Sequence, residues 1–298
     1  MPDLAMAGAE ATLSAALRHA AVALRAQGVD EPAADARRLA AAVLGMSAAQ
    51  MLAHPEHVLS PEQASRLSRL LARRARREPV SRILGEREFY GRVFSISPAT
   101  LDPRPDSETL VEAALALVRA EGSPARPLRI LDVGTGSGCL LLSLLAELPN
   151  ATGVGTDVSE PALCVARDNA SRLGLASRAR WLVADMIEGV DGPFDLLISN
   201  PPYVATAEIA MLEPEVRSFD PLAALDGGPD GLHAFHRLAP GCGEIVPDGW
   251  IVLEVGHEQA DAVAALLGAA LGRAGASRPR IFTDLAGRQR CVAMRSRN

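Results

Sequence analysis

The stretch that decides the fold is Leu128-Arg129-Ile130-Leu131-Asp132-Val133-Gly134-Thr135-Gly136-Ser137-Gly138. Its first six residues form a largely apolar run that is typical of a buried strand, and the glycines that follow predict a tight loop. The leucine-rich segment from Cys139 to Glu147 then predicts a helix. A strand, a glycine loop and a helix in this order form the unit that holds a phosphate or a cofactor in a doubly wound α/β sheet.

The glycine spacing argues against two common nucleotide-binding motifs. A dinucleotide fingerprint needs its third glycine five positions after the first, but here Gly138 follows Gly134 by four, and Cys139 takes the required place. A P-loop would need a Gly-Lys-Ser/Thr sequence, which this segment does not contain. The loop therefore argues against NAD or FAD.

Two further predicted strands end in acidic residues. Gly153-Val154-Gly155-Thr156-Asp157 ends about 20 residues beyond the glycine loop, where a carboxylate can hold both hydroxyls of a ribose. Trp181-Leu182-Val183-Ala184-Asp185-Met186 ends in an acid that could accept from an adenine amino group, while Met186 packs on the ring. Each acid alone is more often a helix cap or a turn former. Together they stand at the carboxyl ends of strands, where open α/β sheets bind ligands.

The fourth predicted strand, Phe194 to Ile198, runs into Ser199-Asn200-Pro201-Pro202-Tyr203. Proline lacks an N–H and pushes the preceding residue into extended geometry, so the prolines end the strand and hold Asn200 extended at its tip. The Asn200 side-chain oxygen and a proline carbonyl can accept both hydrogens of a planar NH2 group, while Tyr203 covers its flat face. Such a clamp fits a carboxamide or the exocyclic amine of a base. A strand that ends in a proline-rich turn is the alternative interpretation.

The N-terminal region predicts a small helical bundle. Residues 12–27 and 35–44 have apolar residues at helical spacing, and Ser60-Pro61-Glu62-Gln63 is typical of a capped helix start. A basic face at three- and four-residue spacing consists of Arg66, Arg69, Arg73, Arg76 and Arg77. This face either contacts phosphate, in ribosomal RNA or a charged partner, or is a solvated helix surface.

A hairpin and a polar block follow the bundle. Short extended pieces around Phe89-Tyr90-Gly91 predict a linking hairpin. The next block contains two prolines, and Asp106 or Ser107 could cap the helix predicted over residues 108–120. Its polar residues Arg104, Asp106 and Glu108 either line a cofactor pocket or brace the domain junction, and we favour the pocket.

The last third of the chain completes the sheet. We predict a helix over residues 231–238, a strand from Trp250 to Val255 and a helix over residues 259–273. Ile281-Phe282 and Cys291-Val292-Ala293-Met294 predict a closing antiparallel pair.

The composition is typical of a globular protein, with 48% hydrophobic and 22% charged residues. The sequence contains no apolar run as long as a membrane span, and its start does not resemble a signal peptide. The four cysteines are scattered, which indicates a reduced compartment and neither disulfides nor a zinc site. We therefore expect a cytoplasmic monomer without a metal and without membrane contact.

Charge is unevenly distributed along the chain. Residues 1–97 have a net charge of +3, whereas residues 98–298 have a net charge of −9. Because an acidic region is a poor partner for a polyphosphate chain, we expect no direct nucleic-acid substrate.

The motifs together resemble class I S-adenosylmethionine-dependent methyltransferases, whose fold is a Rossmann-like α/β sheet. Asn200-Pro201-Pro202-Tyr203 narrows the resemblance to the branch that methylates planar amide or amine nitrogens. The resemblance implies S-adenosyl-L-methionine as the cofactor. The residues implied to bind it are Asp132, Gly134, Thr135, Gly136, Ser137, Gly138, Asp157, Asp185, Met186 and Asn200.

The whole chain is similar to HemK/PrmC-type protein-(glutamine-N5) methyltransferases, which modify the glutamine of the Gly-Gly-Gln loop in peptide chain release factors. Further matching segments are Arg82-Ile83-Leu84-Gly85, Phe89-Tyr90, Leu101-Asp102-Pro103-Arg104-Pro105-Asp106-Ser107-Glu108, Pro221-Leu222-Ala223-Ala224-Leu225-Asp226-Gly227-Gly228, Leu253-Glu254-Val255-Gly256 and Asp284-Leu285-Ala286-Gly287-Arg288. Two residues depart from the family pattern: Asp102 stands where an apolar residue is usual, and Met186 stands where an aromatic residue often follows the acid.

This resemblance implies a division of the chain into three parts. Residues 1–79 would form a helical substrate-recognition domain, residues 80–100 the linking hairpin, and residues 101–298 the methyltransferase domain. The implied partner is a peptide chain release factor.

The resemblance also implies roles for the residues of the tetrapeptide. The Asn200 side-chain oxygen and the Pro201 carbonyl accept the two amide hydrogens of the glutamine, while Pro202 and Tyr203 pack against its side chain. Alignment alone can contribute roughly 7–11 kcal/mol, so no strong base is needed. Two alternatives remain at this point: an adenine-amine (N6) methyltransferase acting on DNA or RNA, and a binding module that has kept the fold without catalysis.

Overall fold

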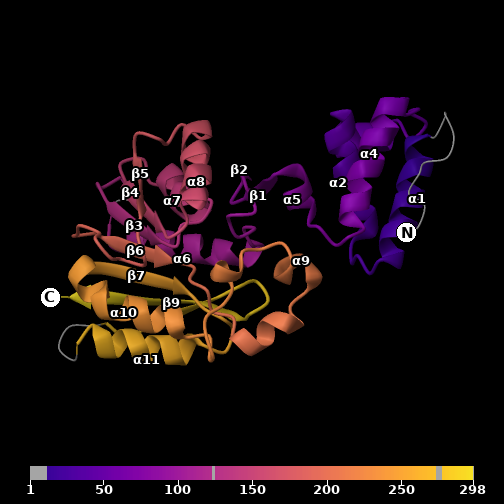
Figure 1. Ribbon diagram of the computed structural model, residues 1–298. Coiled ribbons are helices and arrows are strands. Elements are labelled where there is room, and N and C mark those ends of the chain that lie inside the picture. Colours follow the sequence, from indigo (N-terminus) through magenta and orange to yellow (C-terminus); the bar gives the residue numbers. More distant parts are fainter. Residues whose placement is uncertain (1–11, 123–124, 273–276, 298) are drawn as a thin grey trace. The chain divides into compact units, whose positions relative to one another are not determined.

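The computed structural model describes residues 12–122, 125–272 and 277–297, and the chain divides into two compact units (Figure 1). The helical unit contains the described residues up to Gly85 together with Glu213–Phe219. The α/β unit contains Glu86–Leu212 and the described residues after Asp220. The helical unit is longer than the predicted bundle because residues 80–84, predicted as extended, form a short helix whose Ile83 is buried in its core.

The helical unit is held together by an apolar core between amphipathic helices. Leu13, Leu39, Leu67 and Leu71 are almost fully buried in it. Ser60 caps its helix reciprocally with Gln63, as the sequence predicts. The helices of this unit are α1 (Leu13–Ala26), α2 (Pro32–Leu44), α3 (Ala48–Ala53), α4 (Pro61–Arg74), α5 (Val80–Leu84) and α9 (Pro214–Arg217).

The predicted basic face is not one continuous helix surface. Arg76 and Arg77 lie beyond the end of α4. Arg73 donates to both carboxylate oxygens of Glu78, at 2.8 and 2.5 Å, and Arg77 donates to both oxygens of Glu215, at 2.5 and 2.7 Å. Two of the five guanidinium groups are therefore bound to carboxylates of the same chain, which weakens the phosphate-contact interpretation.

The α/β unit is built on a seven-stranded sheet with the order β5-β4-β3-β6-β7-β9-β8. The first five of these strands are parallel and the last two pairings are antiparallel, which confirms the predicted doubly wound sheet and its closing pair. The order reverses between β3 and β6, and ligands bind at such a switch point in open α/β sheets. The strands of the sheet are β3 (Arg129–Val133), β4 (Thr152–Asp157), β5 (Ala179–Val183), β6 (Leu196–Ser199), β7 (Asp248–Glu254), β8 (Arg280–Thr283) and β9 (Gln289–Arg297).

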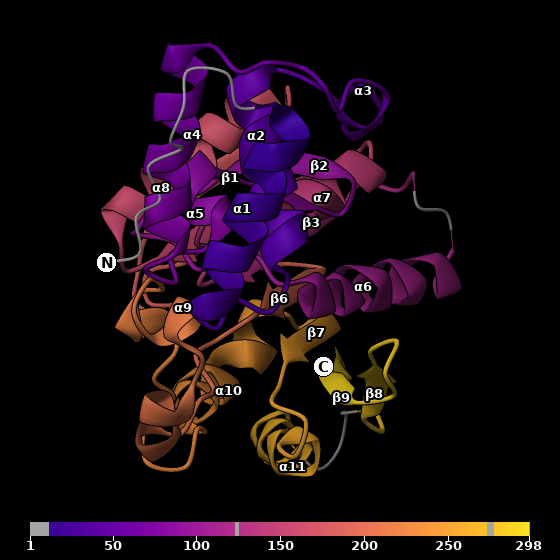
Figure 2. The ribbon, with the colours of Figure 1, turned by 90° about the vertical axis from the view of Figure 1, so that its right-hand side faces the viewer.

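Helices cover both faces of this sheet (Figure 2). Successive strand residues point to opposite faces, so Ile130 packs in the core beneath α6 and α7, while Leu131 packs in the core beneath α10 and α11. A separate hairpin precedes the sheet, as predicted. The remaining elements are β1 (Glu86–Phe89), β2 (Arg92–Ser95), η1 (Pro105–Ser107), α6 (Glu108–Ala120), α7 (Cys139–Glu147), α8 (Glu160–Arg172), η2 (Thr206–Met211), η3 (Leu222–Ala224), α10 (His233–Ile245) and α11 (Ala260–Ala270).

Helix α10 is longer than predicted. The sequence predicts its end at residue 238, but the helix continues through Pro240 to Ile245. A proline inside a helix removes one hydrogen bond and strains the preceding turn. Burial of Leu238, Cys242 and Ile245 in the core offsets that cost, because each side chain packs against the sheet.

Gly155 in β4 is required by close packing. A Cβ atom at this position would lie 2.6 Å from Cζ3 of Trp181 and 2.9 Å from Oγ1 of Thr135. We expect Gly155→Ala to lower the free energy of unfolding by about 1–3 kcal/mol, because overpacking shifts the neighbouring side chains. Urea denaturation measures the change. Gly268→Ala is the matched control: it lies within α11, its Cβ would have 3.9 Å of room, and alanine favours helix, so it should not destabilise.

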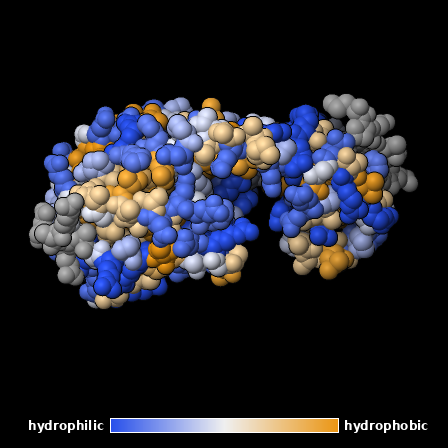
Figure 3. Space-filling model, turned by 90° about the horizontal axis from the view of Figure 1, so that it is seen from below, coloured by the Kyte–Doolittle hydropathy of each residue, from blue (hydrophilic) through white to orange (hydrophobic). Residues whose placement is uncertain are grey.

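No helix among the described residues is long and apolar enough to cross a membrane. The face seen in Figure 3 carries both hydrophilic and apolar residues, and the apolar ones form their broadest area on the α/β unit.

Candidate active site

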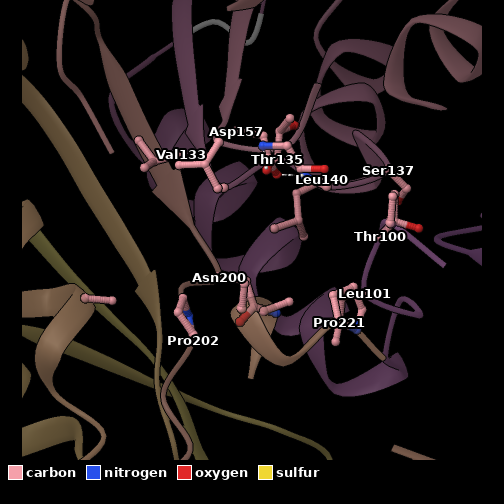
Figure 4. Close-up of a pocket in the computed structure, with 18 of the residues that line it drawn as sticks. Thr100, Leu101, Val133, Thr135, Ser137, Leu140, Asp157, Asn200, Pro202 and Pro221 are labelled. Atoms are coloured by element: carbon pink, nitrogen blue, oxygen red, sulfur yellow. Dashed lines mark hydrogen bonds between the residues drawn. The ribbon is translucent and has the colours of Figure 1, made fainter. Parts of the chain in front are cut away.

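A cavity of about 510 Å³ lies within the α/β unit at the carboxyl ends of the parallel strands. Figure 4 shows Thr135 and Asp157 on one side of it and Asn200 and Pro202 on the other. Its volume is in the range typical of small-molecule sites. The residues predicted for the site that line it are Arg104, Gly134, Thr135, Gly136, Ser137, Asp157, Asp185, Met186, Asn200 and Pro202.

The glycine loop forms a turn that side chains would strain. Gly134, Gly136 and Gly138 have φ values of 72°, 55° and 78°, in the left-handed region that glycine tolerates. The Thr135 amide donates to the Thr156 carbonyl at 2.8 Å, which ties the loop to β4. At Gly134 and Gly136 a Cβ would meet no atom within 4 Å, so the backbone there is open to a ligand. Gly138, which directly precedes α7, does not line the cavity. It packs instead against the side chain of Trp181 in β5.

Asp157 supports the loop and still faces the cavity. One carboxylate oxygen accepts from the Gly136 amide at 2.9 Å and the other accepts from the Ser159 amide at 2.9 Å. A carboxylate offers about four acceptor positions, so two remain for hydroxyl groups of a ligand. This is the capacity that ribose binding would need.

Asp132 lies behind the loop and not on the cavity wall. Its side chain is fully buried, and it accepts from Oγ1 of Thr135 at 2.6 Å. Burial raises the pKa of Asp132 to about 7, and the bond from Thr135 only partly opposes this shift. The residue therefore braces Thr135 from beneath the loop.

Substitution of Asp132 should change how stability depends on pH. A folded pKa of about 7 lies above the unfolded value of about 3.9, so the folded state binds this proton more tightly. The contribution of protonated Asp132 to the free energy of unfolding is fully present below about pH 4 and is lost as the pH rises through about 7. We expect the stability of wild type relative to Asp132→Asn to fall between about pH 4 and pH 7 and to level off above that, as measured by urea denaturation. A difference that stays constant would contradict the assignment.

Asp185 and Met186 line the cavity beyond the end of β5. Asp185 accepts from Nη2 of Arg237 at 2.7 Å, and Arg237 itself lines the cavity. Met186 has a φ of 55°, and its carbonyl accepts from Oγ1 of Thr156 at 3.0 Å. Arg237 was not predicted, because it comes from the part of α10 close to the predicted helix end and the local sequence has no motif there.

Asn200 stands directly after β6, and its orientation is fixed by a hydrogen bond. Its amide nitrogen Nδ2 donates to Oγ of Ser107 at 3.2 Å. The carbonyl oxygen Oδ1 is then the amide atom left to accept from a ligand. The sequence suggests Ser107 as a cap for the following helix. In the structure Ser107 directly precedes α6, which begins at Glu108, but its side chain makes no capping hydrogen bond.

The other residues of the tetrapeptide lie at different places around the cavity. Pro202 lines it, whereas Pro201 is buried and does not. The Tyr203 hydroxyl donates to Oε1 of Glu254 at 3.2 Å, and the Tyr203 carbonyl accepts from Gln259 at 3.0 Å. Tyr203 is not among the residues that line the cavity, so the structure does not show it covering a ligand.

The polar block before α6 divides between the cavity and the framework. Arg104 lines the cavity and pairs with Asp220. Asp106 accepts from Arg290 at 2.5 Å, and Glu108 accepts from the Tyr90 amide at 2.9 Å. Neither acid lines the cavity, which does not support the pocket prediction for these two residues. Their partners lie in the same α/β unit, so these bonds brace that unit, and the predicted brace at the domain junction stays a prediction.

Two of the framework residues were not found from the sequence. Asn169 is 1% exposed and links Ser95 of the hairpin to Ser137 of the glycine loop, donating to both carbonyls at 2.9 Å. Glu254, the last residue of β7, is 2% exposed beside the tetrapeptide. Glu254 is an acid at the carboxyl end of a strand, like Asp157, and this position is the feature of the sequence that could have indicated a role near the site.

The comparisons with known proteins agree with this geometry. A family model described as the PrmC N-terminal domain matches residues 15–85, and one described as a methyltransferase small domain matches residues 111–213. The hMettl16 catalytic domain, solved with the MAT2A 3′UTR hairpin 6, shares the fold at a TM-score of 0.55 and 16% identity, over 80% of this chain and 84% of that chain. The predicted class I methyltransferase fold is confirmed.

Sequence relatives match nearly the whole chain. The release factor glutamine methyltransferase of Rhodospirillum rubrum is 48% identical over 92% of this chain and 82% of its own length. That of Cereibacter sphaeroides is 46% identical, over 94% of this chain and 97% of its own length. That of Moorella thermoacetica is 41% identical, again over 94% and 97%. The chain belongs to the family of release factor glutamine methyltransferases.

Proposed function

We propose that this protein transfers a methyl group from S-adenosyl-L-methionine to the side-chain nitrogen N5 of the glutamine in the Gly-Gly-Gln motif of peptide chain release factors. The names of the relatives support the substrate. The observation that supports the chemistry is the orientation of Asn200: its Nδ2 donates to Ser107 at 3.2 Å, so its Oδ1 can accept from a substrate amide. A carboxamide NH2 group offers the two hydrogens that such a site needs.

The residues around the cavity fit S-adenosyl-L-methionine. The open backbone at Gly134 and Gly136 allows close approach, and Asp157 has acceptor positions left for ribose hydroxyls. Asp185 and Met186 line the cavity, and we expect them to contact the adenine ring; Asp185 is also bound to Arg237. When bound, the cofactor supplies an electrophilic methyl group on a cationic sulfonium.

In this proposal the chain acts by positioning. Oδ1 of Asn200 and the carbonyl of Pro201 are the proposed acceptors for the two amide hydrogens, and they aim the glutamine nitrogen toward the cofactor side of the cavity. Because Pro201 does not line the cavity, this proposal requires its carbonyl to become accessible when the substrate binds. The same two oxygens stabilise the positive charge that develops on the nitrogen, because preorganised dipoles need no rearrangement during the reaction. The proton leaves to water afterwards. Pro202 and Tyr203 support the backbone that holds these acceptors.

The partner and the compartment follow from the proposed substrate. Release factors act in translation, so the protein would work in the cytoplasm as a monomer that meets one release factor at a time. The net charge of −6 is consistent with a protein substrate and is unfavourable for a nucleic-acid strand.

A peptide map by mass spectrometry tests the proposal. An unmodified release factor is incubated with this protein and S-adenosyl-L-methionine, and the expected result is one added methyl group on the Gly-Gly-Gln glutamine. A map without that methyl group, from a protein shown by calorimetry to bind the cofactor, would overturn the substrate. DNA and RNA incubated in parallel would then test the adenine-amine alternative.

A further inference from the structure

Glu254 lies at the centre of a buried hydrogen-bond network beside the tetrapeptide. It ends β7, and the parallel register that pairs Ser199 with Leu253 places Glu254 next to Asn200. Its carboxylate accepts from the Tyr203 hydroxyl at 3.2 Å. The nearby Ser107 hydroxyl is a hydrogen-bonding neighbour that favours the ionised form of Glu254 and so opposes the rise of its pKa. Glu254 is thus joined to Tyr203 directly and to Asn200 through Ser107.

The hydrogen bonds of this network fit one consistent order of donors and acceptors. Asn200 donates Nδ2–H to Oγ of Ser107 at 3.2 Å, and a serine hydroxyl has one proton to donate. Because Ser107 already accepts from Asn200, we assign its proton to the buried carboxylate of Glu254, which is 2% exposed. The order is therefore Asn200 to Ser107 to Glu254, with Tyr203 donating to Glu254 from the other side.

This order matters because an asparagine amide can rotate by half a turn with almost no change in shape. Only the hydrogen bonds around it decide whether the oxygen or the nitrogen faces the cavity. If Ser107 lost its acceptor, its proton could turn to Oδ1 of Asn200. The amide would then present N–H groups to a substrate NH2 group, which also donates, and the two would repel.

We propose that Glu254 is a positioning residue for the methyl transfer, which fixes the amide of Asn200 through Ser107 and the ring of Tyr203 directly. The inference rests on the proposed function, because it assigns a role toward the same substrate amide. Glu254 acts as an acceptor and does not touch the reacting atoms.

The proposed role needs the acceptor oxygen of Glu254 and not its charge, because Oε1 accepts from Tyr203 in either protonation state of the carboxyl group. Burial raises its pKa to about 7, while Ser107, Tyr203 and Arg290 oppose this shift and Asp106 adds to it. Oε2 is buried and has no hydrogen-bond partner among the described residues, so a proton can reside there while Oε1 still accepts. A glutamine side chain would reproduce that protonated form.

The test compares Glu254→Met with Glu254→Gln. Methionine keeps an unbranched side chain of similar length without a strong acceptor, so we expect kcat to fall by about 10²-fold, as for a misplaced catalytic group. Glutamine keeps one acceptor oxygen and should retain most of kcat. The KM for the release factor and the Kd for S-adenosyl-L-methionine, measured by calorimetry, should change little in both variants. Glu258→Met, at a side chain that is 86% exposed, is the control.

A second variant tests the network without altering the carboxylate. Ser107→Ala should lower kcat to a similar extent, and the double variant with Glu254→Met should be no worse than either single variant, because both remove one chain of bonds. A wild-type kcat in Glu254→Met, or equal losses in the methionine and glutamine variants, would overturn the role. If the wild-type protein itself methylated no release factor, the proposed function would fail instead, and the assignment would fall with it.

Discussion

Replacement of Asn200 by alanine is expected to lower kcat for release-factor methylation by about 10²–10³-fold, the range seen when one preorganised polar group at a reacting centre is removed. The variant loses Oδ1, one of the two acceptors that would hold the substrate amide. Ser107 keeps its bond to Glu254, so the framework should remain folded. Methylation is measured by mass spectrometry under single-turnover conditions, with cofactor in excess.

Binding measurements separate this effect from damage to the cofactor site. Asn200 is one of many residues that line the cavity, so the Kd for S-adenosyl-L-methionine should rise only a few-fold. Asn150→Ala is the matched control, because Asn150 is exposed and far from the cavity lining, and its side chain donates to the Ala125 carbonyl at 2.6 Å. Near-normal turnover in Asn200→Ala would exclude the tetrapeptide as the substrate clamp, whatever the cofactor does.

The parts of the site that could be predicted from the sequence are those at the ends of consecutive parallel strands. Gly134, Asp157, Asp185 and Asn200 each follow or end an apolar run, and parallel strands place such residues at one edge of the sheet. Each of these sequence patterns is local, and the parallel order of the strands brings the residues together at one edge of the sheet. This is why a cavity lined by residues far apart in the chain was predictable in outline.

The second layer around the site could not be predicted in the same way. Asp106 and Arg290 are 184 positions apart in the chain, and Asn200 and Ser107 are 93 apart. Nothing in the local sequence of either partner distinguishes a brace from a pocket residue, so Asp106 was assigned to the cavity. The partners are chosen by tertiary packing, which periodicity and motif spacing do not describe.

One short segment within the predicted methyltransferase domain belongs to the helical unit. Glu213–Phe219 packs with the helical unit, although residues on either side of it, Leu212 and Asp220, belong to the α/β unit. A loop-rich stretch without a core of its own gives no sign of the unit to which it belongs. The charge of Glu215 is the local feature that fits this placement, because Glu215 binds Arg74 and Arg77 of the helical unit.

Replacement of Glu215 by alanine is expected to destabilise the helical unit by about 3 kcal/mol, the lower end of the cost of removing one partner of a buried ion pair. Its carboxylate accepts from Arg74 at 3.0 Å and from Arg77 at 2.5 and 2.7 Å. The Arg74 side chain is only 7% exposed, so it cannot turn to water. Asp35, which accepts from Arg74 at 2.7 Å, keeps the cost below that of a fully orphaned charge.

The pH dependence gives this assignment an independent check. Burial alone would raise the pKa of Glu215, but hydrogen bonds from Arg77 and Arg74 outweigh it and lower the pKa. A lowered folded pKa means that the stabilisation is present above the unfolded value of about 4.3 and is lost as the pH falls through the folded value. Hydrogen exchange of the α2 and α4 amides should therefore show wild type and Glu215→Ala converging in acid. Glu56→Ala, at a side chain that is 73% exposed, should match wild type throughout, and equal protection of Glu215→Ala and wild type at neutral pH would show that the ion cluster contributes nothing.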